Sequence, residues 1–203
     1  MCMQVEWLTN GDMWANSYIV GNILVDAGVM PMAVAPYKEQ IETIVLTHCH
    51  FDHTGGAARL KNLIPGLKTV AHELDAPFLE RGDNEATAAD WYDAEIVPFP
   101  VDIKLSGPRE KILLGDREIV ALHAPGHSPG SVVYLFESEG KKVLFAQDVH
   151  GPLHPSFLSN REDYLNSLEM MLELEADILC EGHYGVFKGK AEAARFIKQF
   201  LNR

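Results

Sequence analysis

Short apolar runs separated by glycine and polar turns dominate the first quarter of the chain. The segments VEWL (5–8), NSYIV (16–20) and NILVDAG (22–28) are rich in β-branched and aromatic residues, which is typical of strands. Gly21 and Asn22, between the last two runs, suit a tight hairpin turn. ETIVLTH (42–48) follows as a continuous apolar run, which indicates a buried strand.

Helical spacing of apolar residues alternates with further strand patterns along the rest of the chain. It predicts helices over 54–64, 73–81, 160–174 and 190–201, and Asn160 stands where a helix N-cap is expected. Further strands are predicted at 68–72, 109–114, 117–124, 131–137, 141–148 and 176–183. Residues 82–108, rich in Asp, Pro and Gly, are predicted to be a loop-dominated insertion of the kind that shapes substrate sites.

The strands fall into two blocks, each followed by helices. An amphipathic helix and a one-faced sheet must each bury their apolar side, so this order predicts two sheets packed face to face with helices outside. The predicted fold class is therefore α/β, as a four-layer αββα sandwich. The length of 203 residues fits one sizeable domain, and we expect a single domain over residues 1–203.

Charge and cysteine content limit the classes of binding partner and the cellular compartment that suit this chain. With 17 basic and 29 acidic residues the net charge is −12, which disfavours nucleic acid and anionic membranes as partners and leaves a small-molecule substrate. The three cysteines form no disulfide framework, the N-terminus has no signal-peptide pattern, and no apolar run is long enough to span a bilayer. These features predict a cytoplasmic protein.

The densest chemistry lies in THCHFDHTGG (47–56), directly after a predicted strand. In an extended chain residues i and i+2 face the same way, so His48 and His50 can converge while Cys49 points elsewhere. Asp52 and His53 follow the bend and can face a neighbouring position. Imidazole and carboxylate are ligands of zinc and ferrous iron, and four in six residues suit half of a two-metal site.

The other half must come from distant segments. Three candidates each follow a predicted strand: His127 in a rigid Pro/Gly turn, Asp148 after KKVLFAQ, and His183 after ADILCEG. Strand ends can meet at one edge of a sandwich, which would bring these side chains to the histidine cluster.

The run HCHFDH resembles the HxHxDH motif of the metallo-β-lactamase superfamily, and PGHSPGS (125–131), Asp148 and EGH (181–183) follow in that family's order. The resemblance covers nearly the whole chain and implies an αββα fold with two divalent metal ions, zinc being expected and iron or manganese the alternatives. It implies that His48, His50 and His127 hold metal 1, that Asp52, His53 and His183 hold metal 2, and that Asp148 bridges them. Asp26 resembles the acid that holds a ligand histidine by its other ring nitrogen.

Other residues have ordinary structural interpretations that compete with functional ones. We expect Cys49 and Cys180 to be buried thiols, and His72 and His123 to be structural histidines. A substrate contact stays open for His150, His154 and Tyr184, with a solvated or structural role as the alternative. Three aromatic residues can line an apolar pocket, with ordinary packing as the alternative: Trp14, Trp91 and Tyr92.

The resemblance to glyoxalase II and the lactonases implies hydrolysis of a thioester or lactone by a metal-bridging hydroxide, with Asp52 orienting it and moving its proton. The main alternative is a mononuclear iron persulfide dioxygenase, which resembles this chain in its HCHxDH run. A nucleic-acid-cutting nuclease is disfavoured by the charge and by the lack of an RNA-binding arm. His50 stands where flavodiiron oxidoreductases have glutamate, and true β-lactamases are mostly exported, so neither class fits.

Overall fold

The computed structural model describes residues 5–9, 14–114, 117–146 and 148–201. The predicted N-terminal features at 1–4 and 10–13 and the turn at 115–116 lie outside these residues, as does Gln147. None of the helices among the described residues is long and apolar enough to cross a membrane.

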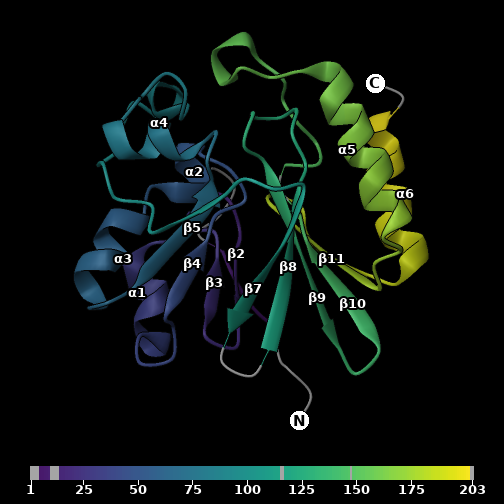
Figure 1. The fold of residues 1–203 in the computed structure, drawn as a ribbon, viewed down its shortest axis with the longest axis horizontal. Helices are drawn as coiled ribbons and strands as arrows, with labels where there is room; N and C mark the ends of the chain where they lie inside the picture. The colour runs from purple at the N-terminus through teal and green to yellow at the C-terminus, as the bar shows by residue number, and fades with distance from the viewer. Residues whose placement is uncertain (1–4, 10–13, 115–116, 147, 202–203) are drawn as a thin grey trace.

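Two six-stranded sheets make up the strand structure of the described residues (Figure 1). The first sheet has the order β1-β2-β3-β4-β5-β6 and the second the order β12-β11-β10-β9-β8-β7. The strands of the first are β1 (Val5–Leu8), β2 (Ser17–Val20), β3 (Ile23–Val25), β4 (Thr43–Val45), β5 (Lys68–His72) and β6 (Ile103–Leu105). Those of the second are β7 (Arg109–Leu114), β8 (Arg117–His123), β9 (Val132–Ser138), β10 (Lys141–Phe145), β11 (Ile178–Glu181) and β12 (Gly185–Lys188).

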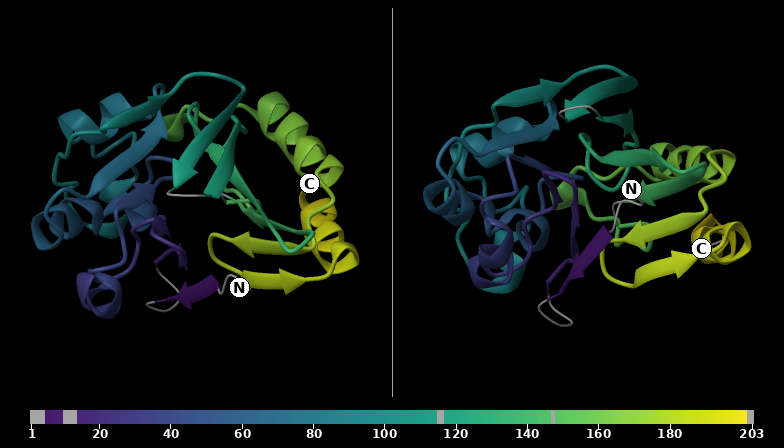
Figure 2. Two further views of the ribbon diagram at one scale, coloured as in Figure 1. Left: turned by 60° about the horizontal axis from the view of Figure 1, so that its bottom comes forward. Right: turned by 90° about the horizontal axis from the view of Figure 1, so that it is seen from below.

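Helices cover the outer faces of both sheets (Figure 1). On one side lie α1 (Pro31–Val34), α2 (Phe51–Thr54), α3 (Ala57–Leu63) and α4 (Ala76–Arg81), and on the other α5 (Arg161–Glu173) and α6 (Lys190–Leu201). Short 3-10 helices η1 (Ala35–Tyr37), η2 (Ala89–Tyr92) and η3 (Pro155–Phe157) lie in the connections. The predicted four-layer αββα sandwich is confirmed, and Figure 2 shows its two sheets facing each other.

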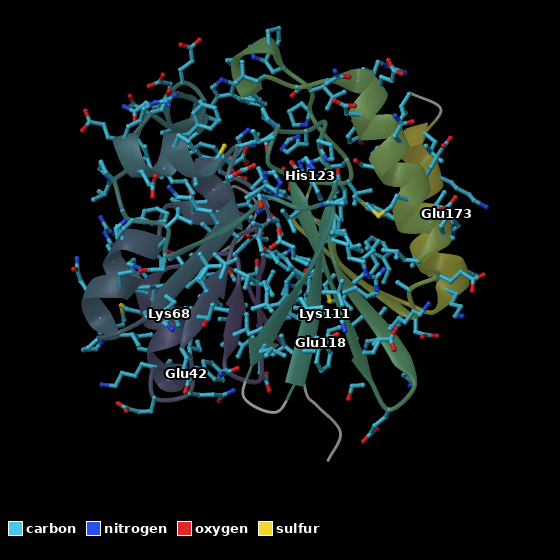
Figure 3. All side chains as sticks on the ribbon, viewed as in Figure 1. Glu42, Lys68, Lys111, Glu118, His123 and Glu173 are labelled. Carbon is cyan, nitrogen blue, oxygen red and sulfur yellow. The ribbon has the colours of Figure 1, made fainter. Side chains whose placement is uncertain are left out.

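Local sequence signals account for most of these elements. The hairpin turn at Gly21 and Asn22 joins β2 to β3 as predicted. The Asn160 side chain caps α5 by accepting hydrogen bonds from the backbone N–H groups of Glu162 and Asp163. Ionisable pairs such as Lys111 and Glu118, 3.0 Å apart, lie at the surface (Figure 3).

Two strands escaped the sequence patterns. The predicted loop-dominated insertion at 82–108 is wrong at its end, because β6 pairs in parallel with β5 as the edge strand of the first sheet. β12, the other strand that was not predicted, pairs with β11 and is an edge strand of the second sheet. Both are short and partly exposed, so neither has the alternation or continuous apolar run that marks a longer strand.

The directions of the strands bring several loops to one edge of the sandwich. β3, β4 and β5 are parallel neighbours, so the chain leaves β3 and β4 at the same edge. β10 and β11 are parallel neighbours in the second sheet, and β8 runs in the same direction because β9 is antiparallel to both. Loops that follow four strands, β3, β4, β10 and β11, therefore meet the β8–β9 turn.

A buried tyrosine connects the two sheets close to this edge. Tyr134 of β9 is fully buried in the core between the sheets, and its hydroxyl donates a 2.8 Å hydrogen bond to the carbonyl of Leu46, just beyond β4. Leu46 stands two residues before His48. This hydrogen bond thus fixes the start of the ligand-bearing loop to the opposite sheet.

We predict that Tyr134→Phe lowers the free energy of unfolding by about 1–3 kcal/mol, because the Leu46 carbonyl is left buried and unpaired. Urea unfolding followed by circular dichroism measures the change. Tyr37→Phe, at a half-buried tyrosine of η1, is the control and should change it by less. Equal stabilities of Tyr134→Phe and the parent would contradict the role of this hydrogen bond.

Candidate metal centre

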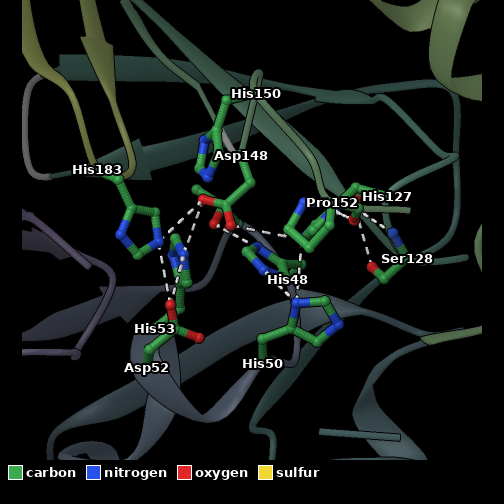
Figure 4. Close-up of polar contacts among 12 residues, drawn as sticks. His48, His50, Asp52, His53, His127, Ser128, Asp148, His150, Pro152 and His183 are labelled. Atoms are coloured by element: carbon green, nitrogen blue, oxygen red, sulfur yellow. Dashed lines mark hydrogen bonds and ion pairs between the residues drawn. The ribbon is translucent and has the colours of Figure 1, made fainter. Parts of the chain in front are cut away.

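The ligand-type side chains predicted from the sequence come together at the edge where the strands end (Figure 4). His48 and His50 lie in the extended segment after β4, and α2 carries Asp52 and His53. His127 lies in the β8–β9 turn, Asp148 follows β10, and His183 follows β11. They form two groups: a three-histidine cluster of His48, His50 and His127, and a mixed cluster of Asp52, His53, Asp148 and His183.

The three-histidine cluster presents three nitrogens to one point. His50 Nδ1 lies 3.0 Å from His48 Nε2 and 3.0 Å from His127 Nε2. A tetrahedral zinc site with metal–nitrogen bonds of about 2.0 Å separates its nitrogens by about 3.3 Å. The spacing of the cluster therefore matches three ligands of one small divalent ion.

For His48 and His127, a hydrogen bond to one ring nitrogen determines which nitrogen stays free to bind a metal. His127 Nδ1 lies 2.9 Å from the Pro152 carbonyl, which can only accept, so Nδ1 carries the hydrogen. The Thr47 hydroxyl donates to Asp26, so it accepts from His48 Nδ1 at 3.0 Å. In a neutral ring the hydrogen on Nδ1 leaves Nε2 with a lone pair, which is the form that ligates a metal.

The mixed cluster contains two carboxylates and two imidazoles. Asp52 Oδ2 lies 3.0 Å from His183 Nε2, and Asp148 Oδ1 lies 3.0 Å from His53 Nε2. Gly182 allows this approach, because a Cβ there would lie 2.4 Å from Asp148 Oδ1. Only His183 is partly exposed, with 19% of its side chain accessible.

Asp148 lies between the two clusters. Its Oδ1 faces the mixed cluster, 3.5 Å from His183 Nε2, and its Oδ2 faces the three-histidine cluster, 3.5 Å from His127 Nε2. One carboxylate thus directs an oxygen to each group, as expected of a residue that bridges two ions.

Asp26 orients His53 of the mixed cluster, in the role predicted from the sequence. Its Oδ2 accepts a 2.7 Å hydrogen bond from His53 Nδ1 and a 2.8 Å bond from the Thr47 hydroxyl, while Oδ1 accepts from the Thr47 backbone N–H at 2.7 Å. Through Thr47 the same carboxylate also orients His48. Asp26 has a left-handed φ of 56°, a conformation that aspartate tolerates better than most residues.

The donor set fits a divalent cation. His53 Nε2 and Asp148 Oδ1 are buried and have no hydrogen-bond partner of acceptable geometry among the described residues, although they lie close together. Buried polar atoms without partners are costly, and a bound cation would satisfy both. Imidazole and carboxylate suit zinc, iron and manganese alike.

The two clusters differ in protonation. Burial lowers the pKa of His48, His50 and His127, so these rings are neutral and ready to bind a metal. Burial alone would also lower the pKa of the mixed-cluster histidines. There the carboxylates prevail: Asp148 leads the groups that raise the pKa of His53 well above its usual value and that of His183 to about 10. A metal ion at the mixed cluster must therefore displace protons.

The two cysteines that were expected to be buried thiols are confirmed as such. Cys49 and Cys180 are buried, and burial raises the pKa of both thiols. Cys49 Sγ points away from the clusters toward the Ala86 carbonyl at 3.6 Å. His72 and His123 stack with ring centroids 3.9 Å apart, outside both clusters.

His150 lies at the mouth of the mixed cluster. Its Nδ1 is 2.9 Å from Glu181 Oε1, and its ring lies 5.1 Å from that of His183 and 5.1 Å from that of Tyr184. Glu181 is fully buried and also accepts hydrogen bonds from the backbone N–H groups of His183 and Tyr184, at 2.7 Å each. Sequence reasoning missed Glu181, because its role depends on a partner in another loop.

Aromatic rings flank the rest of the centre. Phe157 packs against His50 with centroids 4.3 Å apart, and the half-exposed Trp91 packs against Phe157 at 4.6 Å. His154 lies against Trp91, 5.2 Å away, and its side chain accepts a hydrogen bond from the backbone N–H of Ser156. Burial, with the Asp52 carboxylate nearby, raises the pKa of Tyr92 on the other flank.

Asp75 is a second residue that the sequence did not reveal. It precedes α4 and is fully buried. Its carboxylate accepts hydrogen bonds from the Cys49 backbone N–H at 2.9 Å, the Ser128 hydroxyl at 2.7 Å and the Gly130 backbone N–H at 2.7 Å. One side chain thus joins the loop of His48 and His50 to the turn of His127.

Comparisons with known proteins identify the family of the chain. The family model of the metallo-beta-lactamase superfamily matches residues 14–183, so the chain belongs to this superfamily. It is 30% identical over 180 residues to the human acyl-coenzyme A thioesterase MBLAC2, covering 78% of this chain and 61% of that one. It is 29% identical over 201 residues to a probable metallo-hydrolase of Methanocaldococcus jannaschii, covering 92% of this chain and 95% of that one.

The fold also has solved counterparts. A subclass B3 metallo-beta-lactamase of Bradyrhizobium japonicum superposes with a TM-score of 0.74 at 24% identity, over 93% of this chain and 85% of the other. This likeness concerns the fold alone. Membership of the superfamily and the two buried clusters together fit a site for divalent metal ions.

We predict that Asp75→Asn weakens metal binding at the three-histidine cluster about 10–100-fold, the usual loss when a residue that orients metal ligands is changed. The amide cannot accept all three hydrogen bonds, so the two ligand loops are no longer held in register. Competition with a chromophoric chelator measures the affinity. Asp102→Asn, whose carboxylate accepts from the Thr69 backbone N–H far from the ligands, is the matched control. A folded Asp75→Asn protein with parental affinity would contradict this role.

Proposed function

We propose that the protein is a hydrolase with two divalent metal ions that cleaves a thioester. The observation that carries this proposal is Asp148, whose two oxygens face two separate ligand clusters. In the proposed assignment His48, His50 and His127 hold one ion, Asp52, His53 and His183 hold the other, and Asp148 bridges them. Zinc is the expected metal, with iron or manganese as alternatives.

When bound, two such ions supply an activated water at neutral pH and polarise the substrate carbonyl. The chain's own residues have separate tasks. Asp26 and the Pro152 carbonyl hold ligand rings in one tautomer, and Asp52 orients the attacking water and accepts its proton. Phe157 and Trp91, which pack beside the three-histidine cluster, limit access of bulk water.

The similarity to a named thioesterase supports a thioester as the substrate. MBLAC2 is named an acyl-coenzyme A thioesterase, and this chain spans about three fifths of its length, 61%. A lactone, whose ring-opening needs the same attack on an ester carbonyl, is the second ester to test. We further propose that residues 1–203 form one domain, that the enzyme is cytoplasmic and binds neither nucleic acid nor membrane, and that His150, His154 or Tyr184 contacts the substrate.

A substrate panel tests the reaction class. Protein reconstituted with zinc, manganese or iron is assayed on thioesters and lactones, with and without a chelator. The proposal expects thioester turnover that the chelator abolishes and that added metal restores. If no ester is cleaved but the iron form consumes oxygen when given a persulfide, the protein is a dioxygenase and the proposal is wrong.

His183→Ala should remove the ion of the mixed cluster selectively. The variant lacks one imidazole of that cluster, while the three-histidine cluster keeps all of its nitrogens. Elemental analysis after reconstitution and gel filtration is expected to fall from two ions per chain to one. His154→Ala, at a histidine outside both clusters, should keep two. Loss of both ions from His183→Ala would contradict the division into two sites.

Asp52→Asn separates chemistry from metal binding. The amide keeps the shape and one neutral oxygen but loses the charge and the proton acceptor. General acid–base groups contribute about 10²–10⁴-fold in rate, and we predict a loss of kcat of that order at saturating metal. Asp102→Asn serves again as the control. If Asp52→Asn retained the parental kcat with both ions bound, Asp52 would be a ligand only.

A further inference from the structure

An apolar cavity of about 410 Å³ adjoins the turn that carries Asp52 and His53. The side chains that define it come from four segments: Trp14, Met30, Phe51, Tyr92 and Val97. Arg59 and Glu95 are its only charged lining residues, and their charges are opposite. Ligand sites for small molecules typically measure 300–1,000 Å³ and are mostly apolar, so the cavity has the size and chemistry of such a site.

Three aromatic rings form one wall of this cavity. The centroid of Trp14 lies 5.4 Å from that of Phe51 and 6.1 Å from that of Tyr92, and Phe51 and Tyr92 are 5.8 Å apart. Met30 and Val97, by contrast, are more than half exposed, at 56% and 58%. Large apolar side chains exposed together at a cavity indicate a binding surface rather than packing.

The cavity lies directly beside the candidate metal centre. Phe51 directly precedes Asp52 in α2, and a Cβ at Gly28, another lining residue, would lie 1.9 Å from the Asp52 carbonyl oxygen. Tyr92 also lines the cavity, and its ring lies 5.8 Å from that of Phe51, the residue before Asp52. A group attached to a carbonyl at the metal centre therefore lies next to this cavity.

We propose that this cavity binds the acyl chain of the thioester substrate, so that the enzyme prefers medium or long alkyl chains to acetyl. The proposal rests on the proposed thioesterase function. An alkyl chain suits the site because it is apolar, flexible and uncharged. The phosphate-bearing end of a thiol carrier does not suit it, because the lining offers one cation against one anion.

Chain length provides the first test. Each methylene removed from water contributes enough to bind about fourfold more tightly, so kcat/KM should rise by about that factor per methylene from acetyl until the cavity is filled. Val97→Glu places a charge in the cavity and should lower the ratio of decanoyl to acetyl kcat/KM at least tenfold. Leu113→Glu, at an exposed leucine of β7 remote from the centre, is the matched control and should keep the ratio.

Binding without chemistry provides the second test. The probe is S-decyl-N-acetylcysteamine, a thioether that cannot be hydrolysed, added to the metal-free protein while tryptophan fluorescence is followed. Binding should change the emission of Trp14, and Trp14→Phe should remove that change. Val97→Glu should weaken the apparent affinity at least tenfold.

The two tests distinguish the failure of this inference from the failure of the proposed function. Thioester hydrolysis that is indifferent to chain length, with no probe binding, would overturn the acyl site and leave the hydrolase proposal intact. Probe binding that Val97→Glu weakens, in a protein that cleaves no thioester, would support the apolar site and overturn the thioesterase function.

Discussion

The buried carboxylate of Asp26 is the interaction on which the arrangement of the metal centre depends. It accepts hydrogen bonds from His53 Nδ1 and from the backbone N–H and the hydroxyl of Thr47. That hydroxyl in turn accepts a hydrogen bond from His48 Nδ1. A histidine ring can ligate through either nitrogen, and only a fixed partner on one side directs the other toward an ion. One acid after β3 thus selects the nitrogen in one ligand of each cluster.

Strand direction brings the remaining ligands to this acid. The loops after β3, β4, β10 and β11 and the β8–β9 turn meet at one edge, and Tyr134 holds the two sheets in register beside it. Asp75 and Glu181 then connect loops that are far apart in the chain. Both buried carboxylates have several hydrogen-bond partners, because an unpaired charge in the interior would be costly.

The residues of the two clusters could be predicted from the sequence, but the buried acids that hold their loops could not. HCHFDH, His127, Asp148 and His183 were recognisable because each follows an apolar strand pattern. The apolar periodicity also predicted α5 and α6 with nearly their observed bounds. Asp75 and Glu181 look like ordinary acids in the sequence, since their function arises from hydrogen bonds to other loops. The strand β6 is too short to show a pattern, and the cavity beside Phe51 is built from four separate segments.

The proposed dinuclear centre requires that two clusters sharing Asp148 hold two ions at once. Anomalous diffraction at the zinc edge, from crystals of protein reconstituted with excess zinc, measures this directly. The account predicts two peaks, one among the nitrogens of His48, His50 and His127 and one among Asp52, His53 and His183, with Asp148 in contact with both. A single peak, or two peaks that do not share Asp148, would contradict it.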